Sequence, residues 1–109
     1  MSGNGSHFRA FVVGGSESDR NSLQKAFDSE KADSYMAPAE QVWEESISDF
    51  RVANCQVLFV GREITGNDPE AILKSMLNAI PDAPLIVFGG PEDEEIGRAS
   101  CRERVYVLV

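Results

Sequence analysis

The sequence has few of the side chains that bind metals or form covalent cross-links. It contains two cysteines, Cys55 and Cys101, which lie far apart and outside any CxxC motif, and a single histidine, His7. A disulfide framework or a zinc site needs more of these residues at closer spacing. We therefore expect reduced thiols, no metal, no cofactor and a cytoplasmic location. We expect His7 to be an exposed residue of a polar N-terminal arm, residues 1–7.

Positive charge and long apolar segments are also scarce. The chain has 10 Lys and Arg against 18 Asp and Glu, a net charge of -8. An acidic surface repels a phosphate backbone, so this domain is not expected to bind nucleic acid. No apolar run approaches the roughly 20 residues of a transmembrane helix, and the N-terminal arm lacks the apolar region of a signal peptide. We therefore expect no binding to membranes.

The stretch at residues 8–20 organises the chain. Its first part, residues 8–13, is the apolar, β-branched and aromatic run typical of a strand buried on both faces of a parallel sheet. Gly14 and Gly15 end this run, and Ser16 follows as a candidate N-cap, with Asp19 at the capping-box spacing. A strand, a glycine turn and a capped helix predict the opening of a βαβ unit.

The rest of the chain alternates apolar runs with amphipathic segments. We predict strands at Ser34–Ala37, Gln56–Val60 and Leu85–Phe88. We predict a first helix from Glu17 to about Glu30, with Leu23, Ala26 and Phe27 on its buried side. A second helix is predicted from Ala39 to about Val52, and its buried side consists of Val42, Trp43, Ile47 and Phe50. A third begins after the N-cap Asp68 and buries Ile72, Leu73, Met76, Leu77 and Ile80.

This alternation predicts an α/β fold, a doubly wound parallel sheet covered on both faces, in one domain at residues 8–94. In such a sheet, ligands bind beyond the carboxyl ends of the strands. The strand ends expected there are Gly14–Gly15, Val60–Gly61 and Gly89–Gly90.

Three segments resemble one protein family. SESDRNSLQKAF, GNDPEAI and PDAPLIVFGGPEDEE, spaced between Phe8 and about Glu95, are similar to the CheY-like receiver domains of bacterial response regulators. The resemblance implies a flavodoxin-like fold and a role in two-component signalling. In that family, strand 1 ends in two acids that hold Mg²⁺, strand 3 in a phosphorylated aspartate, strand 4 in Thr or Ser, and strand 5 supplies a lysine. Hard carboxylate oxygens suit Mg²⁺, and a carboxylate accepts the phosphoryl group.

The residues at the family's functional positions differ from that pattern. The acid pair falls on Gly14 and Gly15, the phosphorylated aspartate on Val60 or on Gly61, and the Thr or Ser on Gly89. None of these side chains can perform the corresponding step, so we expect a degenerate receiver without catalytic activity. Four acids lie near the expected crevice, but helix capping already explains two of them, Asp19 and Asp68; the other two are Glu17 and Glu63.

The segment at residues 95–109 departs from the rest in charge and pattern. Glu95–Val105 can be back-translated without a gap into a sequence similar to a widely used sequencing-library adapter. We therefore expect residues 95–109 to be non-native, to mimic helix 4 and an edge strand, Val105–Val109, and to leave the sheet incomplete. An output domain is expected to follow in the native protein.

Three functions fit these features. The first is a phosphorylation-independent signalling module that binds a protein partner, its own output domain or a second copy. The second is an enzyme, because GSESD at Gly15–Asp19 resembles the phosphate-binding motif of carboxyaminoimidazole mutases. The third is a non-catalytic anion site at the same turn, with Gly15, Ser16 and Ser18 as its binding residues.

Overall fold

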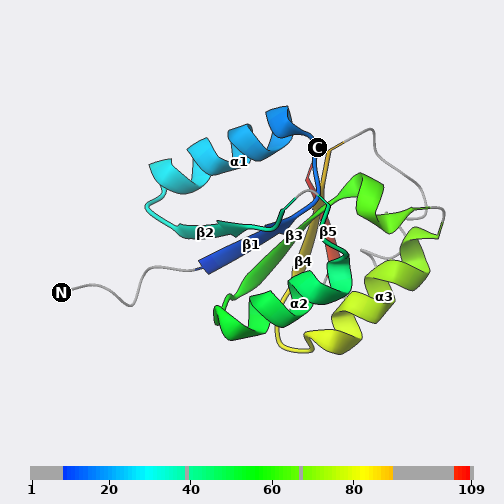
Figure 1. The fold of residues 1–109 in the computed structure, drawn as a ribbon. Helices are drawn as coiled ribbons and strands as arrows, with labels where there is room; N and C mark the ends of the chain where they lie inside the picture. The colour runs from blue at the N-terminus through cyan, green and yellow to red at the C-terminus, as the bar shows by residue number, and fades with distance from the viewer. Residues whose placement is uncertain (1–8, 39, 67, 90–104, 109) are drawn as a thin grey trace.

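The computed structural model describes residues 9–38, 40–66, 68–89 and 105–108 (Figure 1). The expected arm at residues 1–7 and the expected fourth helix lie outside the described residues. In chain order, the elements are β1 (Arg9–Val13), α1 (Glu17–Ser29), β2 (Asp33–Met36), α2 (Trp43–Val52), β3 (Val57–Gly61), the short 3₁₀ helix η2 (Arg62–Thr65), α3 (Pro69–Ala79), β4 (Leu85–Phe88) and β5 (Val105–Leu108).

The strands form one parallel sheet in the order β2-β1-β3-β4-β5. This is the flavodoxin-like order, which reverses direction between β1 and β3. Val13 pairs with Val60 and Val60 with Val87, so the carboxyl ends of β1, β3 and β4 lie at one level. The predicted α/β fold class is confirmed.

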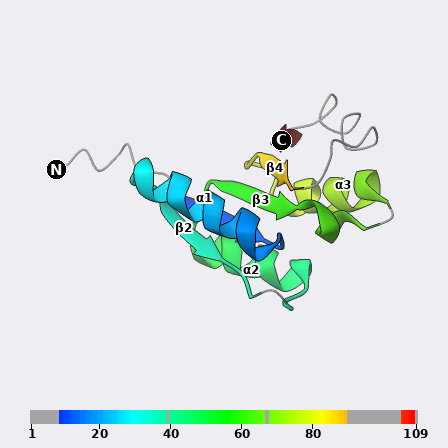
Figure 2. The same ribbon diagram turned by 90° about the horizontal axis from the view of Figure 1, so that it is seen from above.

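Helices cover the sheet on both faces (Figure 2). α1 packs on one face, where Leu23 and Phe27 meet Val12 and Phe59. The Phe27 and Phe59 rings meet edge to face, with centroids 5.2 Å apart. α2 and α3 cover the other face through a larger cluster of buried residues: Phe11, Val13, Ala37, Ile47, Phe50, Leu58, Val60, Leu73, Met76, Leu77, Ile80, Ala83, Leu85 and Val87. Trp43 packs against this cluster as predicted.

The structure corrects the predicted start of α2. The helix begins at Trp43 rather than Ala39, because a turn closed by a hydrogen bond from Gln41 N to Pro38 O precedes it. Val42 is therefore the N-cap in extended conformation and is 55% exposed, not part of the core. Ala26 on α1 is also exposed, contrary to the prediction, and the buried side of that helix is limited to Leu23 and Phe27.

β5 occupies the edge position predicted for residues 105–109 and pairs with β4 in parallel, with Leu85 opposite Val105. The sheet therefore has a fifth strand, and the expectation that it would be left incomplete is wrong. That residues 95–109 are non-native stays a prediction. Within the described part of the chain, no helix has the length and apolar character needed to cross a membrane.

Candidate functional site at the carboxyl edge of the sheet

The turn between β1 and α1 consists of two glycines in left-handed conformation. Gly14 has a φ of 77° and Gly15 a φ of 94°, values that residues with a Cβ rarely adopt. A Cβ on Gly15 would lie 2.5 Å from Cε2 of Phe88, the last residue of β4. The two glycines thus allow the backbone that leaves β1 to contact an aromatic ring two strands away in the sheet.

α1 begins directly after this turn, as the sequence predicts. Ser16 Oγ accepts a hydrogen bond from the Asp19 backbone N–H at 3.1 Å, which confirms Ser16 as the N-cap. Ser16, Glu17 and Ser18 are exposed. The Asp19 carboxylate reaches toward the end of β4, because a Cβ on Gly89 would lie 2.9 Å from its Oδ2 atom.

Glu63 connects this turn to the segment after β3. It lies in η2, and its Oε2 atom accepts a hydrogen bond from Gly15 N at 2.5 Å. Its carboxylate also reaches Gly14, where an added Cβ would be 2.8 Å from Oε2. The sequence gives Glu63 no role beyond its charge. The structure places that charge on the first backbone donor of the predicted anion-binding turn.

Arg20 connects the same turn to the end of β2. Its Nη2 donates to Ala37 O at 2.6 Å, and its Nη1 lies 3.4 Å from Gly14 O. Both acceptors are backbone carbonyls just beyond the ends of β1 and β2, and a cationic donor forms a charge-assisted hydrogen bond with each of them. The sequence does not indicate this contact either, because Arg20 is one of several charged residues on the predicted solvent-facing side of the helix.

The ends of β1 and β3 pack backbone to backbone. A Cβ on Gly61 would lie 2.3 Å from Gly15 N and 2.8 Å from Gly15 Cα. Gly61 has ordinary extended geometry, with φ of -65° and ψ of 140°, so close approach rather than backbone angle requires glycine here. The carboxyl edge between β1 and β3 is therefore filled by main chain and by the Glu63 carboxylate. We call this arrangement of Gly14, Gly15, Arg20, Gly61 and Glu63 the closed rim.

The described residues offer little to a metal ion. Among them, no three of His, Cys, Asp and Glu lie close enough together to hold one. Asp68 is the N-cap of α3, as predicted, and its carboxylate accepts from Ala71 N at 3.3 Å. The Asp19 carboxylate lies beside Gly89, and the Glu63 carboxylate accepts a hydrogen bond from the Gly15 amide.

Comparisons with known proteins bear on the fold. No family model and no curated protein matches the chain. Among solved structures, the chain is similar to the crystal structure of a CheY-like protein, TadZ, from Pseudomonas aeruginosa PAO1, with a TM-score of 0.69. The similarity covers 91% of this chain and 84% of that protein. The chain has a CheY-like fold. The sequence identity is 18%, so the similarity describes the backbone arrangement and not the chemistry.

The receiver positions can now be located in the CheY-like fold. Gly14 and Gly15 follow β1, Val60 lies in β3 and Gly89 follows β4, so all four lie at the carboxyl edge. Val60 is fully buried in the core under α2 and α3. The predicted anion-binding residues Gly15, Ser16 and Ser18 lie together at the start of α1, with the Gly15 amide already bound to Glu63.

Proposed function

We propose that this chain is a phosphorylation-independent, receiver-like module that acts by binding another protein. The observation that supports this most directly is the contact between Gly61 and Gly15 in the closed rim. An acyl phosphate and its Mg²⁺ require carboxylates and open space at this edge. Here the corresponding positions carry Gly14, Gly15 and Val60, and the space is taken by backbone and by Glu63.

A receiver-like fold that cannot be phosphorylated still has the helix and strand surfaces through which it can bind another protein. Helices on both faces and the two edge strands remain available for a partner, for an output domain or for a second copy of the chain. In this proposal the module docks constitutively or responds to a signal other than phosphorylation. Its regulation then depends on where the partner binds and on how much partner is present.

Incubation with acetyl phosphate and Mg²⁺ tests the proposal. The product is examined by intact mass spectrometry at neutral pH, with a phosphorylatable receiver domain treated in parallel as positive control. We expect the control to gain a phosphoryl group and this chain to keep its original mass. A phosphoryl group that hydroxylamine removes, as expected for an acyl phosphate on a carboxylate, would contradict the proposal.

The phosphate-binding enzyme remains the alternative. One observation weighs against it, since the Gly15 amide that would hold the phosphate already binds the Glu63 carboxylate. Titration with a nucleoside monophosphate, followed through the amide signals of Gly15, Ser16 and Ser18, distinguishes the two functions. Saturable shifts confined to these residues favour the enzyme or the non-catalytic anion site, and unchanged signals favour the interaction module.

A further inference from the structure

The start of α2 exposes an apolar side chain where a polar one is the usual choice. Val42 is the N-cap of this helix, and its side chain makes no capping hydrogen bond. The α-helices α1 and α3 begin instead at Ser16 and Asp68, whose side chains do cap. Val42 is also 55% exposed, so it contributes little to the core. A residue that neither caps its helix nor packs inside the fold breaks a local rule without a structural gain, as residues of functional surfaces do.

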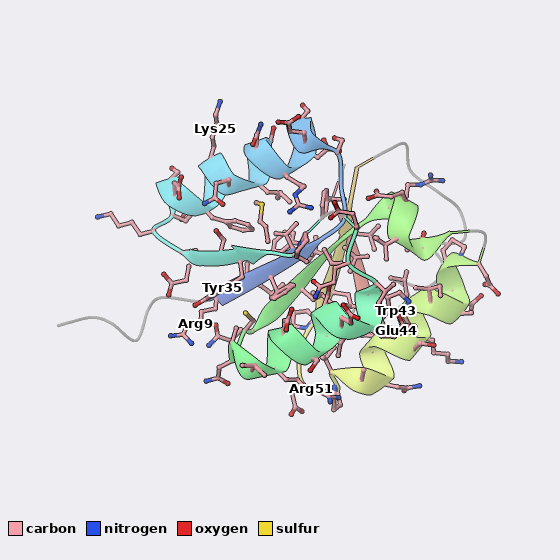
Figure 3. The ribbon with its side chains drawn as sticks, viewed as in Figure 1. Arg9, Lys25, Tyr35, Trp43, Glu44 and Arg51 are labelled. Carbon is pink, nitrogen blue, oxygen red and sulfur yellow. The ribbon has the colours of Figure 1, made fainter. Side chains whose placement is uncertain are left out.

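Trp43 extends this apolar surface. It is the single tryptophan of the chain, and it packs against the core cluster under α2 and α3 while staying only partly buried. Figure 3 shows Trp43 and Glu44 at the start of α2. An aromatic side chain that the core holds on one side and that solvent reaches on the other is well suited to anchor a protein partner.

The charge around these two residues is negative. The sequence from Ala32 to Phe50 contains acids but no Lys, Arg or His. Within the described part of the chain, the exposed acids next to Val42 and Trp43 form no ion pair: Glu40, Glu44, Glu45 and Asp49. Arg20 reaches Ala37 O in the loop before α2, but its guanidinium is used by that carbonyl and by Gly14 O.

Helix stability explains only part of this charge. Glu44 and Glu45 suit the first turn of a helix, but Glu45 lies four residues before Asp49, a like-charged spacing that is unfavourable. Gln41 holds the acids in place: its Nε2 donates to Asp49 Oδ2 at 3.1 Å, and its Oε1 accepts from Ser46 Oγ at 3.2 Å. A surface ordered before binding loses less entropy when a partner arrives. We define the α2 surface as Glu40, Val42, Trp43, Glu44, Glu45 and Asp49.

We propose that the α2 surface binds a basic amphipathic segment of a partner protein, one that presents an apolar side chain between Lys or Arg residues. The apolar side chain covers Val42 and Trp43, and the cations meet the surrounding acids. A second copy of this chain does not fit, because its net charge of -8 would bring acids against acids. This inference rests on the proposed function and names the chemistry of its partner.

The fluorescence of Trp43 tests the proposal, since no other tryptophan contributes. The probe is a tryptophan-free synthetic peptide of lysine and leucine, about 14 residues long so that it can form an amphipathic helix. One comparison peptide has glutamate in place of lysine, and the other has serine in place of leucine. We expect the Lys/Leu peptide to shift the Trp43 emission saturably, and each comparison peptide to bind at least about tenfold more weakly.

One substitution separates binding from stability. V42S supplies a good N-cap and removes the exposed apolar group, so we expect it to raise the urea midpoint while weakening peptide binding about fivefold. V52S is the matched control, because Val52 is 84% exposed at the other end of the same helix, and it should leave binding unchanged. Equal peptide affinities of V42S and V52S would overturn the proposal.

A double substitution tests the charge. E44Q/E45Q is expected to weaken binding about fivefold at low salt, an effect that about 0.5 M NaCl removes. The control E17Q/E30Q also removes two exposed acids, from the two ends of α1, and should bind like the unaltered chain. Circular dichroism shows whether each variant folds, and if E44Q/E45Q does not, the comparison of V42S with V52S decides.

Three further outcomes would overturn the proposal: no saturable shift, equal binding of the Glu/Leu peptide, or equal weakening by E44Q/E45Q and E17Q/E30Q. A dimer in sedimentation equilibrium that V42S dissociates would assign the surface to a second copy and overturn it as well. These results are distinct from a failure of the proposed function, because phosphorylation by acetyl phosphate is read from the mass of the chain and not from Trp43.

Discussion

The Glu63 carboxylate accepts a hydrogen bond from the Gly15 amide, with 2.5 Å between Oε2 and N. The two residues are 48 positions apart, and the bond joins the β1–α1 turn to the segment that follows β3. An internal carboxylate thus lies where the start of a helix would otherwise attract an external anion.

Removing the Glu63 carboxylate should destabilise the fold modestly. The bond is exposed, so we expect E63A to lower the free energy of unfolding by about 1 kcal/mol. E63Q retains an acceptor oxygen and should cost less. Urea unfolding followed by circular dichroism measures the change, with E40A as the control that removes an exposed acid elsewhere. Equal stability of E63A and E40A would show that the contact contributes nothing.

Arg20 should contribute more than an ordinary surface residue. R20M keeps the apolar stem and removes both carbonyl contacts, to Ala37 and Gly14, so we expect a loss of about 1–3 kcal/mol. K25M on the same helix is the matched control, because Lys25 is exposed. The comparison is made by thermal and urea unfolding. If R20M and K25M unfold together, Arg20 does not hold the rim.

Any side chain at position 61 should lower the free energy of unfolding. Its backbone angles suit any residue, but the added Cβ of G61A would meet Gly15 N at 2.3 Å, so the strands must shift. We expect a loss of about 2–3 kcal/mol by overpacking. V52A, which shortens a side chain that is 84% exposed, should change stability by less than about 0.5 kcal/mol. A G61A variant as stable as V52A would mean that β1 and β3 do not meet closely.

The sequence predicts the fold well because its signals are local. Apolar runs locate the first four strands of the chain within one residue, and Ser16 and Asp68 mark two helix starts correctly. The start of α2 was predicted wrongly. The apolar side chains of Ala39 and Val42 suggested a longer helix, but a turn closed by a hydrogen bond from Gln41 N to Pro38 O precedes α2, which begins at Trp43. Periodicity describes which residues can share a face and not where the helix begins.

The candidate site was less predictable. The positions of Gly14, Gly15, Val60 and Gly89 at the carboxyl edge follow from the order of strands. The contacts of Glu63 with Gly15 and of Arg20 with Ala37 join segments distant in sequence, and no spacing rule indicates them.

The Cys55 thiol should ionise at higher pH in the folded chain than in the unfolded chain. Burial disfavours the thiolate and raises its pKa, with Arg9 acting in the opposite direction. The protonated thiol therefore stabilises the fold below the unfolded pKa, and this contribution is lost as pH rises through the folded pKa. Iodoacetamide rates against pH for C101S, with and without urea, measure both midpoints. A folded midpoint at or below the unfolded one would contradict this expectation.

The closed rim is tested most directly by the amide signal of Gly15 in a ¹H–¹⁵N NMR spectrum recorded while Mg²⁺ and acetyl phosphate are added. Because that amide is bound to Glu63 and packed against Gly61, we expect its signal and those of Gly14 and Gly89 to stay in place. Saturable shifts of these signals that require both additions would show that the edge opens and accepts a phosphoryl group, contrary to the proposed function.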